Sequence, residues 1–215
     1  MTSLKIGARV SKEKGEKTMD ILQRVKNIIM TPKTEWPVIA AEEPNIVEIF
    51  KGYVLPLALI PSIAYIIGLG VIGMGMMSSF SWGLAMGLIQ FILAFVGIYI
   101  SAYVIAFLAP KFGSQQDLGR SVQLVAYSYT PAWVAGIFSI VPALGLLAFV
   151  GGIYGLYLMY LGLPHTMKTP QDKTIAYLVV SIIAVLVTYW ILTLILTSIV
   201  LSVFGLSTMT MTRGM

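Results

Sequence analysis

The side chains that could perform chemistry in this chain are few and far apart. General acid–base or nucleophilic catalysis needs paired carboxylates, or a histidine or cysteine with partners close by. The sequence has nine acidic residues, one histidine and no cysteine. His165 lies in a polar loop beside Lys168, where an ordinary loop histidine is the first interpretation and a functional switch the second. A single histidine with scattered carboxylates does not make a metal site. We therefore predict no enzymatic activity, no metal and no cofactor.

Phosphate-binding and nucleic-acid-binding motifs are also missing from the sequence. The closely spaced glycines at 68, 70, 73 and 75 lack the lysine of a phosphate-binding loop and lie in an apolar stretch. The formal net charge is +5, but the basic residues alternate with acidic ones and lie next to apolar segments. Attraction to anionic lipid headgroups explains such a charge. We predict no binding of nucleic acid.

A few polar and helix-breaking residues occur inside long apolar stretches. Gln90 and Gln123 are the only amide side chains there, and such groups either form hydrogen bonds between helices or line a polar cavity. Tyr129 and Pro131 indicate either a packed kink or a broken helix with exposed carbonyls, as transporters use. The candidate intramembrane residues are Pro56, Pro61, Gln90, Gln123, Tyr129 and Pro131.

The composition indicates that these residues are positioned by membrane helices. Hydrophobic residues make up 58% of the chain and charged residues 11%, against about 45–50% and about 25% in soluble domains. Residues 52–110, 121–167 and 174–212 contain no Asp, Glu, Lys or Arg. A membrane-spanning helix needs about 20 apolar residues, so the first two stretches hold two helices each and the third holds one. We predict an all-α integral membrane protein with five transmembrane helices.

The five predicted spans have approximate limits that prolines, glycines and charges set. Prolines at 56 and 61 kink the first span, and Pro131 interrupts the third. Carbonyl groups freed by these prolines must face protein or water, because lipid cannot satisfy them. The predicted spans cover about residues 45–73, 82–108, 121–140, 143–163 and 174–204.

The sequence before the spans divides into two parts. Residues 1–18 form a basic tail that we expect to be mobile, and residues 19–50 form a cytoplasmic or interfacial segment. Apolar residues at helical spacing in 21–29 predict a short amphipathic helix that lies in the headgroup plane. We expect four residues to lie at the membrane surface: Arg24, Lys26, Lys33 and Trp36. Residues 51–205 then form the membrane domain and 206–215 a short external tail.

The distribution of basic residues predicts the orientation. Thirteen of the 14 Lys and Arg residues fall on one side of the predicted spans, and Arg213 alone falls on the other. Cytoplasmic loops carry the excess of Lys and Arg. We predict a cytoplasmic amino terminus and an external carboxyl terminus.

Small residues recur four positions apart within the spans, which lets helices approach closely. Whether the contacts lie within one chain or between subunits is open at this point. The pairs are Gly83 and Gly87, Gly97 and Ser101, Ala132 and Gly136, and Gly151 and Gly155.

Residues 19–204 resemble the bacterial branch of the Yip family, the Ypt/Rab-interacting membrane proteins. The resemblance rests on the order of short segments: ILQRVKNII (21–29), TPKTEW (31–36), GYVLP (52–56), IP (60–61), AYSYTPAW (126–133), IVP (140–142), YGLY (154–157) and GLP (162–164). It implies a five-helix membrane domain with a cytoplasmic amino terminus in the bacterial plasma membrane. Eukaryotic relatives are associated with Rab GTPases, but their long amino-terminal region is missing here. The family supplies no catalytic residues.

Two functional hypotheses follow. The first is a non-enzymatic protein that organises membrane or recruits partners at the cytoplasmic face, with anionic lipid, other proteins or a second copy of the chain as partners. Removing residues 1–30 should then leave insertion intact and abolish this binding. The alternative is a small transporter, channel or lipid scramblase with a path through the five helices. The absence of charge within the spans disfavours ion-coupled transport, although a lipid or neutral solute needs no such charge.

Overall fold

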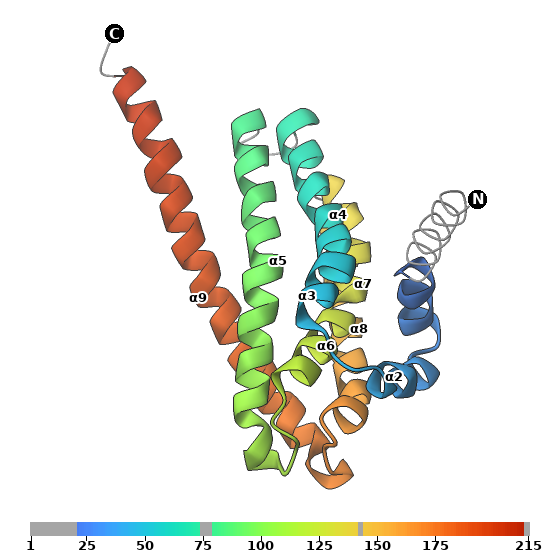
Figure 1. Cartoon of the computed structure of the whole chain (residues 1–215). Helices are drawn as coiled ribbons and strands as arrows, with labels where there is room; N and C mark the ends of the chain where they lie inside the picture. The colour runs from blue at the N-terminus through green and yellow to red at the C-terminus, as the bar shows by residue number, and fades with distance from the viewer. Residues whose placement is uncertain (1–20, 74–78, 142–143, 213–215) are drawn as a thin grey trace, which may run out of the picture.

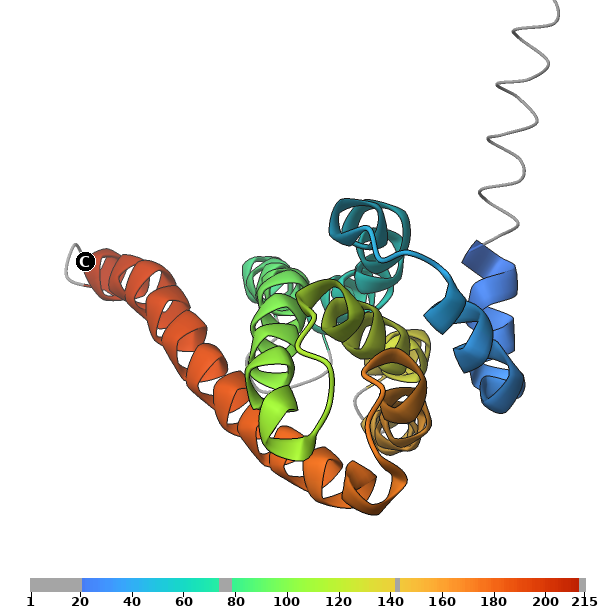
Figure 2. The same cartoon turned by 60° about the horizontal axis from the view of Figure 1, so that its bottom comes forward.

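The computed structural model describes residues 21–73, 79–141 and 144–212, and nearly all of them are helical. No strand occurs in these ranges. The long helices α5 (Phe80–Leu108), α8 (Gly145–Thr166) and α9 (Gln171–Thr212) extend along the bundle, with α4 (Leu55–Tyr65) packed beside α5 (Figure 1). Figure 2 shows helix 21–30 and α2 (Pro32–Ala41) at one edge and the carboxyl-terminal half of α9 at the other.

Four helical segments of the described chain are long and apolar enough to cross a membrane: Ile46–Val71, Phe80–Phe112, Leu146–Thr166 and Gln171–Ile199. The first joins α3 (Ile46–Ile49), a π-helical turn (Phe50–Val54), α4 and a second π-helical turn (Ile66–Val71). The second continues from α5 into a 3-10 helix (Ala109–Phe112). These segments match the predicted first, second, fourth and fifth spans.

The predicted third span has a different form. It consists of three short consecutive helices, α6 (Leu118–Ser128), α7 (Thr130–Ala135) and a 3-10 helix (Gly136–Ile140). Every residue from Ser121 to Ser128 is buried, with α5 and α8 packed against α6. Its polar residues therefore contact protein and not lipid. Polar groups at membrane depth are stable only when protein or water satisfies them. This part of α6 lies in the interior of the bundle, whereas Val134, Ile137 and Phe138 further along are exposed.

The break between α6 and α7 compensates for the hydrogen bond that Pro131 cannot make. In a regular helix the Tyr127 carbonyl would accept from the nitrogen of residue 131, and a proline nitrogen carries no hydrogen. The Thr130 hydroxyl donates to the Tyr127 carbonyl at 2.7 Å and so takes over this role. The Tyr53 hydroxyl lies 2.6 Å from the same Thr130 oxygen. The Tyr127 carbonyl is therefore satisfied at the break between the two helices.

The two prolines of the first span also have specific surroundings. Pro56 is the second residue of α4, and the Leu55 backbone nitrogen before it donates to the Phe50 carbonyl of the π-helical turn. Pro61 is buried and packs on Gly136, where an added Cβ would lie 2.7 Å from the Pro61 Cβ. The absence of a side chain at Gly136 lets α4 approach the α7 region.

The glycine pairs act mainly within one chain. A Cβ at Gly83 would lie 2.5 Å from the Gly70 backbone nitrogen, and one at Gly87 would lie 2.8 Å from the Ser62 carbonyl oxygen. Gly151 and Gly155 of α8 pack equally closely on α7 and α6. Gly97 is different, because an added Cβ would have no atom within 4 Å.

One expected boundary differs from the structure, and two expected segments lie outside the residues that the structure describes. Helix α9 continues to Thr212, past residue 205, where we expected the membrane domain to end. Residues 1–18 and the turn at 142–143 lie outside the described residues.

These contacts predict that alanine changes the free energy of unfolding differently at two glycines of the same helix. Gly83→Ala should lower the free energy of unfolding by about 1–3 kcal/mol, because the new methyl group collides with backbone atoms. Gly97→Ala is the matched control and should be neutral or slightly stabilising, because its methyl group enters open space. Denaturation in mixed detergent micelles measures both. Equal losses for the two variants would contradict the packing described.

Candidate functional site

The segment before the first span is folded onto the bundle and is part of its core. Helix α2 packs on α8, and Ile28, Trp36 and Ile39 are fully buried. The Trp36 indole contacts Gly162 of α8, where an added Cβ would lie 2.8 Å from the ring. Ile28 of helix 21–30 thus faces protein, with Ile21, Val25 and Ile29 partly buried beside it, whereas Leu22 is exposed.

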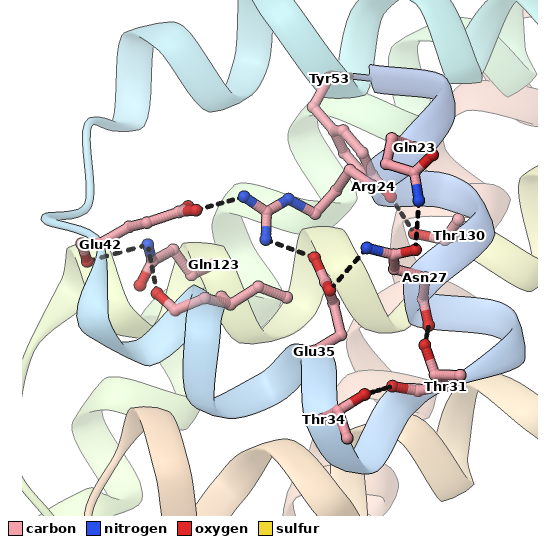
Figure 3. A network of polar contacts seen from close by, with 11 residues as sticks. Gln23, Arg24, Asn27, Thr31, Thr34, Glu35, Glu42, Tyr53, Gln123 and Thr130 are labelled. Atoms are coloured by element: carbon pink, nitrogen blue, oxygen red, sulfur yellow. Dashed lines mark hydrogen bonds and ion pairs between the residues drawn. The ribbon is translucent and has the colours of Figure 1, made fainter. Parts of the chain in front are cut away.

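A buried arginine joins helix 21–30 to the residues that follow it. The Arg24 guanidinium donates to a Glu35 carboxylate oxygen at 2.6 Å and also to Glu42 (Figure 3). Asn27 donates to the second oxygen of Glu35 at 3.0 Å, and the guanidinium lies 5.7 Å from the centre of the Tyr127 ring. Glu35 is 6% exposed. Buried charges are tolerated when they are paired in this way.

The electrostatics of Arg24 favour its charged form. Burial by itself would lower the pKa, but the hydrogen bond and charge of Glu42, with further help from Glu35, more than offset that effect. The pKa of Arg24 therefore lies above its ordinary value. Arginine is already protonated at neutral pH, so the ion pair keeps its positive partner there.

A second arginine satisfies the carboxyl end of α2. The Arg120 guanidinium donates to the carbonyls of Ala40 at 2.9 Å and Glu42 at 2.6 Å, which have no partners within the helix. It also donates to the Gln123 side-chain oxygen at 3.1 Å. The Asp117 side chain caps α6 by accepting a hydrogen bond from the Arg120 backbone nitrogen at 2.9 Å. Gln123, which is 2% exposed, is therefore part of this polar network and does not face a membrane path.

These elements enclose a pocket of about 280 Å³ between helix 21–30, the start of the first span and α6. We call it the acidic pocket. Carboxylates, an arginine and two tyrosines line it, and a Cβ at Gly52 would meet no atom within 4 Å. The lining residues are Ile21, Arg24, Glu42, Glu43, Asn45, Glu48, Ile49, Gly52, Tyr53, Gln123 and Tyr127. In the part of the chain that the structure describes, no three potential metal ligands come together.

Two adjoining cavities lie deeper, between α4, α5, α7, α8 and α9, with volumes of about 390 and 340 Å³. We call them together the membrane cavity, because they share lining residues that include Tyr129 and Gly152. Pro61 and Gln90 line the larger one. No lining residue of the membrane cavity lines the acidic pocket.

The candidate residues therefore do not surround one path. Pro61, Gln90 and Tyr129 meet at the membrane cavity, whereas Gln123 lines the acidic pocket. Pro56 and Pro131 line neither space. The six residues therefore do not all line one of these cavities.

Two of the four expected membrane-surface residues are inside the protein. Trp36 is fully buried and the Arg24 side chain is 12% exposed, because α8 covers the indole and two carboxylates hold the guanidinium. Lys26 and Lys33 are exposed. The sequence analysis did not identify Glu35 and Arg120 as site residues. The one available signal was the pair of opposite charges, Arg24 and Glu35, on either side of Pro32, which could have indicated an ion pair.

The long apolar helices define a polytopic helical membrane protein, and comparison with known proteins gives the family. The Yip1 domain matches residues 26–195, so the chain belongs to the Yip1 domain family. It is 27% identical over 165 residues to the inner membrane protein YohC of Escherichia coli K12, and equally to YohC of strain O6:H1. Each match covers 73% of this chain and 85% of the relative. No solved structure shows a significant match.

Removal of the buried guanidinium should be costly. Arg24→Met removes the ion pair from the buried Glu35, which keeps only Asn27, and from the more exposed Glu42, and we expect a loss of about 1–3 kcal/mol in the free energy of unfolding. The matched control Lys26→Met, on the exposed side of the same helix, should stay within about 0.5 kcal/mol of the parent. Denaturation in mixed micelles compares the two. An Arg24→Met variant as stable as the control would show that the ion pair does not hold the segment in place.

Proposed function

We propose that this chain is a non-enzymatic, multi-pass protein of the bacterial inner membrane that recruits a partner or organises the membrane at the cytoplasmic face. Membership of the Yip1 domain family and the similarity to YohC, which is called an inner membrane protein, support the location. The four long apolar helices agree with a multi-pass arrangement.

The observation that carries the proposal is the acidic pocket and the folded segment that builds it. Arg24 and Arg120 hold helix 21–30 and α2 in place, so the pocket has fixed walls. Glu42 and Glu43 contribute negative charge, and Tyr53 and Tyr127 contribute aromatic surface. Carboxylates and aromatic rings together suit a cationic group. A partner segment with exposed Lys or Arg side chains fits this chemistry best.

We further propose how the chain lies in the membrane. The amino terminus is cytoplasmic and the carboxyl terminus external, because the basic residues are concentrated on one side. Leu118–Ile140 then serves as a short fifth crossing inside the bundle. Lys26 and Lys33, both exposed, face anionic headgroups. Helix 21–30 lies near the interface although part of its apolar side packs on protein.

A role for residues 1–18 is testable separately from the pocket. Deleting residues 1–30, as the sequence suggested, would also remove Arg24 and the fully buried Ile28 and so disturb the core. Deletion of residues 1–18 removes five basic side chains and leaves the described contacts in place.

The membrane cavity is the observation that favours a second candidate, a transporter, channel or lipid scramblase. Gln90 and Tyr129 meet there as that hypothesis expected. The membrane cavity and the acidic pocket share no lining residue. We therefore place the recruiting role before the transport role.

Site-specific photocrosslinking in cells tests the recruiting role. Glu43→benzoylphenylalanine, at the exposed rim of the acidic pocket, should give a discrete adduct with another protein, including a second copy of this chain. Adding Glu48→Lys, at an exposed lining residue that does not pair with Arg24, should reduce that adduct by lowering the pocket's negative charge.

The matched control is Leu146→benzoylphenylalanine, at an exposed position near the start of α8. It should give lipid adducts only. Lipid adducts alone from position 43, or the same protein adducts from both positions, would contradict the proposal.

A further inference from the structure

The membrane cavity is bounded by helices that lie well apart in the sequence. Gly97 of α5, Trp133 of α7, Gly152 of α8 and Leu186 of α9 all line its larger part. Gly152 and Leu186 also line the smaller part, so the two parts adjoin.

Two glycines keep this space open. A Cβ added at Gly97 or Gly152 would meet no atom within 4 Å, whereas one at Gly151, the neighbour of Gly152, would lie 2.6 Å from the Pro131 carbonyl oxygen. The same helix α8 therefore presents one glycine to a close contact and the next to open space. Interiors are normally packed without such voids, and the atoms lining an unfilled one lose dispersion contacts.

The cavity is accessible from the side of the bundle. Phe149 and Leu186 line it and are nevertheless 65% and 61% exposed. They belong to α8 and α9, and α9 leans away from the bundle toward its carboxyl end (Figure 1). Both helices are candidate membrane spans, so the medium outside this opening is the hydrocarbon of the bilayer.

The lining of the cavity specifies an uncharged occupant. No Asp, Glu, Lys or Arg is among its lining residues. Its polar lining groups are uncharged, and they include the hydroxyls of Tyr129 and Ser139 and the amide of Gln90.

We propose that the membrane cavity is a lipid site that takes one acyl chain of a membrane phospholipid, which enters between α8 and α9. The acyl chain fills the space beside Gly97 and Gly152 and contacts the Trp133 indole. This site is independent of the acidic pocket and of the partner proposed for it.

Tryptophan fluorescence tests the proposal, because bromine atoms on acyl chains quench an indole only at short range. Trp133 is 5% exposed and lines the cavity, whereas Trp190 of α9 is 65% exposed on the outside. One variant keeps only Trp133, with the other three tryptophans changed to Phe, and a companion keeps only Trp190. Each is reconstituted into phosphatidylcholine with ordinary chains or with chains brominated near their middle.

Brominated lipid should quench both proteins. Gly97→Leu and Gly152→Leu, which fill the cavity from two different helices, should each remove the quenching of Trp133 and leave that of Trp190 unchanged. Ala176→Leu, at an exposed position of α9, is the matched control and should change neither. Elution as the parental species in gel filtration identifies the folded variants, and the second filling variant keeps the test decisive if the first does not fold.

Two results would overturn the proposal. One is a Trp133 that brominated lipid does not quench in the unfilled protein, because the acyl chain then does not reach the cavity. The other is quenching that persists equally in the folded Gly97→Leu and Gly152→Leu proteins, because it then comes from lipid outside the bundle.

Discussion

The arrangement of this protein depends on a guanidinium group that has been taken out of water. Arg24 is paired inside the protein with Glu35 of α2 and with Glu42 at the carboxyl end of the same helix. This pairing brings helix 21–30 and α2 together. Arg120 adds a second connection by binding the end of α2 from α6. The acidic pocket is the space left between the parts that these two arginines hold.

A different constraint governs the interior of the bundle. Backbone groups freed by a proline need partners in hydrocarbon, and Thr130 supplies one for the Tyr127 carbonyl. This lets α6 and α7 occupy the middle of the molecule as a broken segment. Glycines then set the distances between neighbouring helices: Gly83 and Gly151 permit contact, whereas Gly97 and Gly152 leave room. The acidic pocket and the membrane cavity thus arise in separate places, from separate causes.

The sequence predicted the long helices well, because charge-free stretches and their length depend on simple transfer energetics. It failed where a pattern has two physical meanings. The apolar residues of 21–29 suit a membrane surface and a protein surface equally, so Trp36 and Arg24 were expected outside and are buried. Carboxylates 11 and 18 positions from Arg24 are not identifiable as its partners by spacing. Gln90 and Gln123 look alike in the sequence, yet they line different spaces.

The central claim is that residues 21–41 belong to the folded body of the protein. Hydrogen exchange of their backbone amides, measured in lipid nanodiscs by mass spectrometry, tests it most directly. We predict slow exchange in the parent protein and in Lys26→Met, and fast exchange of these residues alone in Arg24→Met, with α5 unchanged. Exchange in the parent as fast as that of an unstructured peptide would contradict the account.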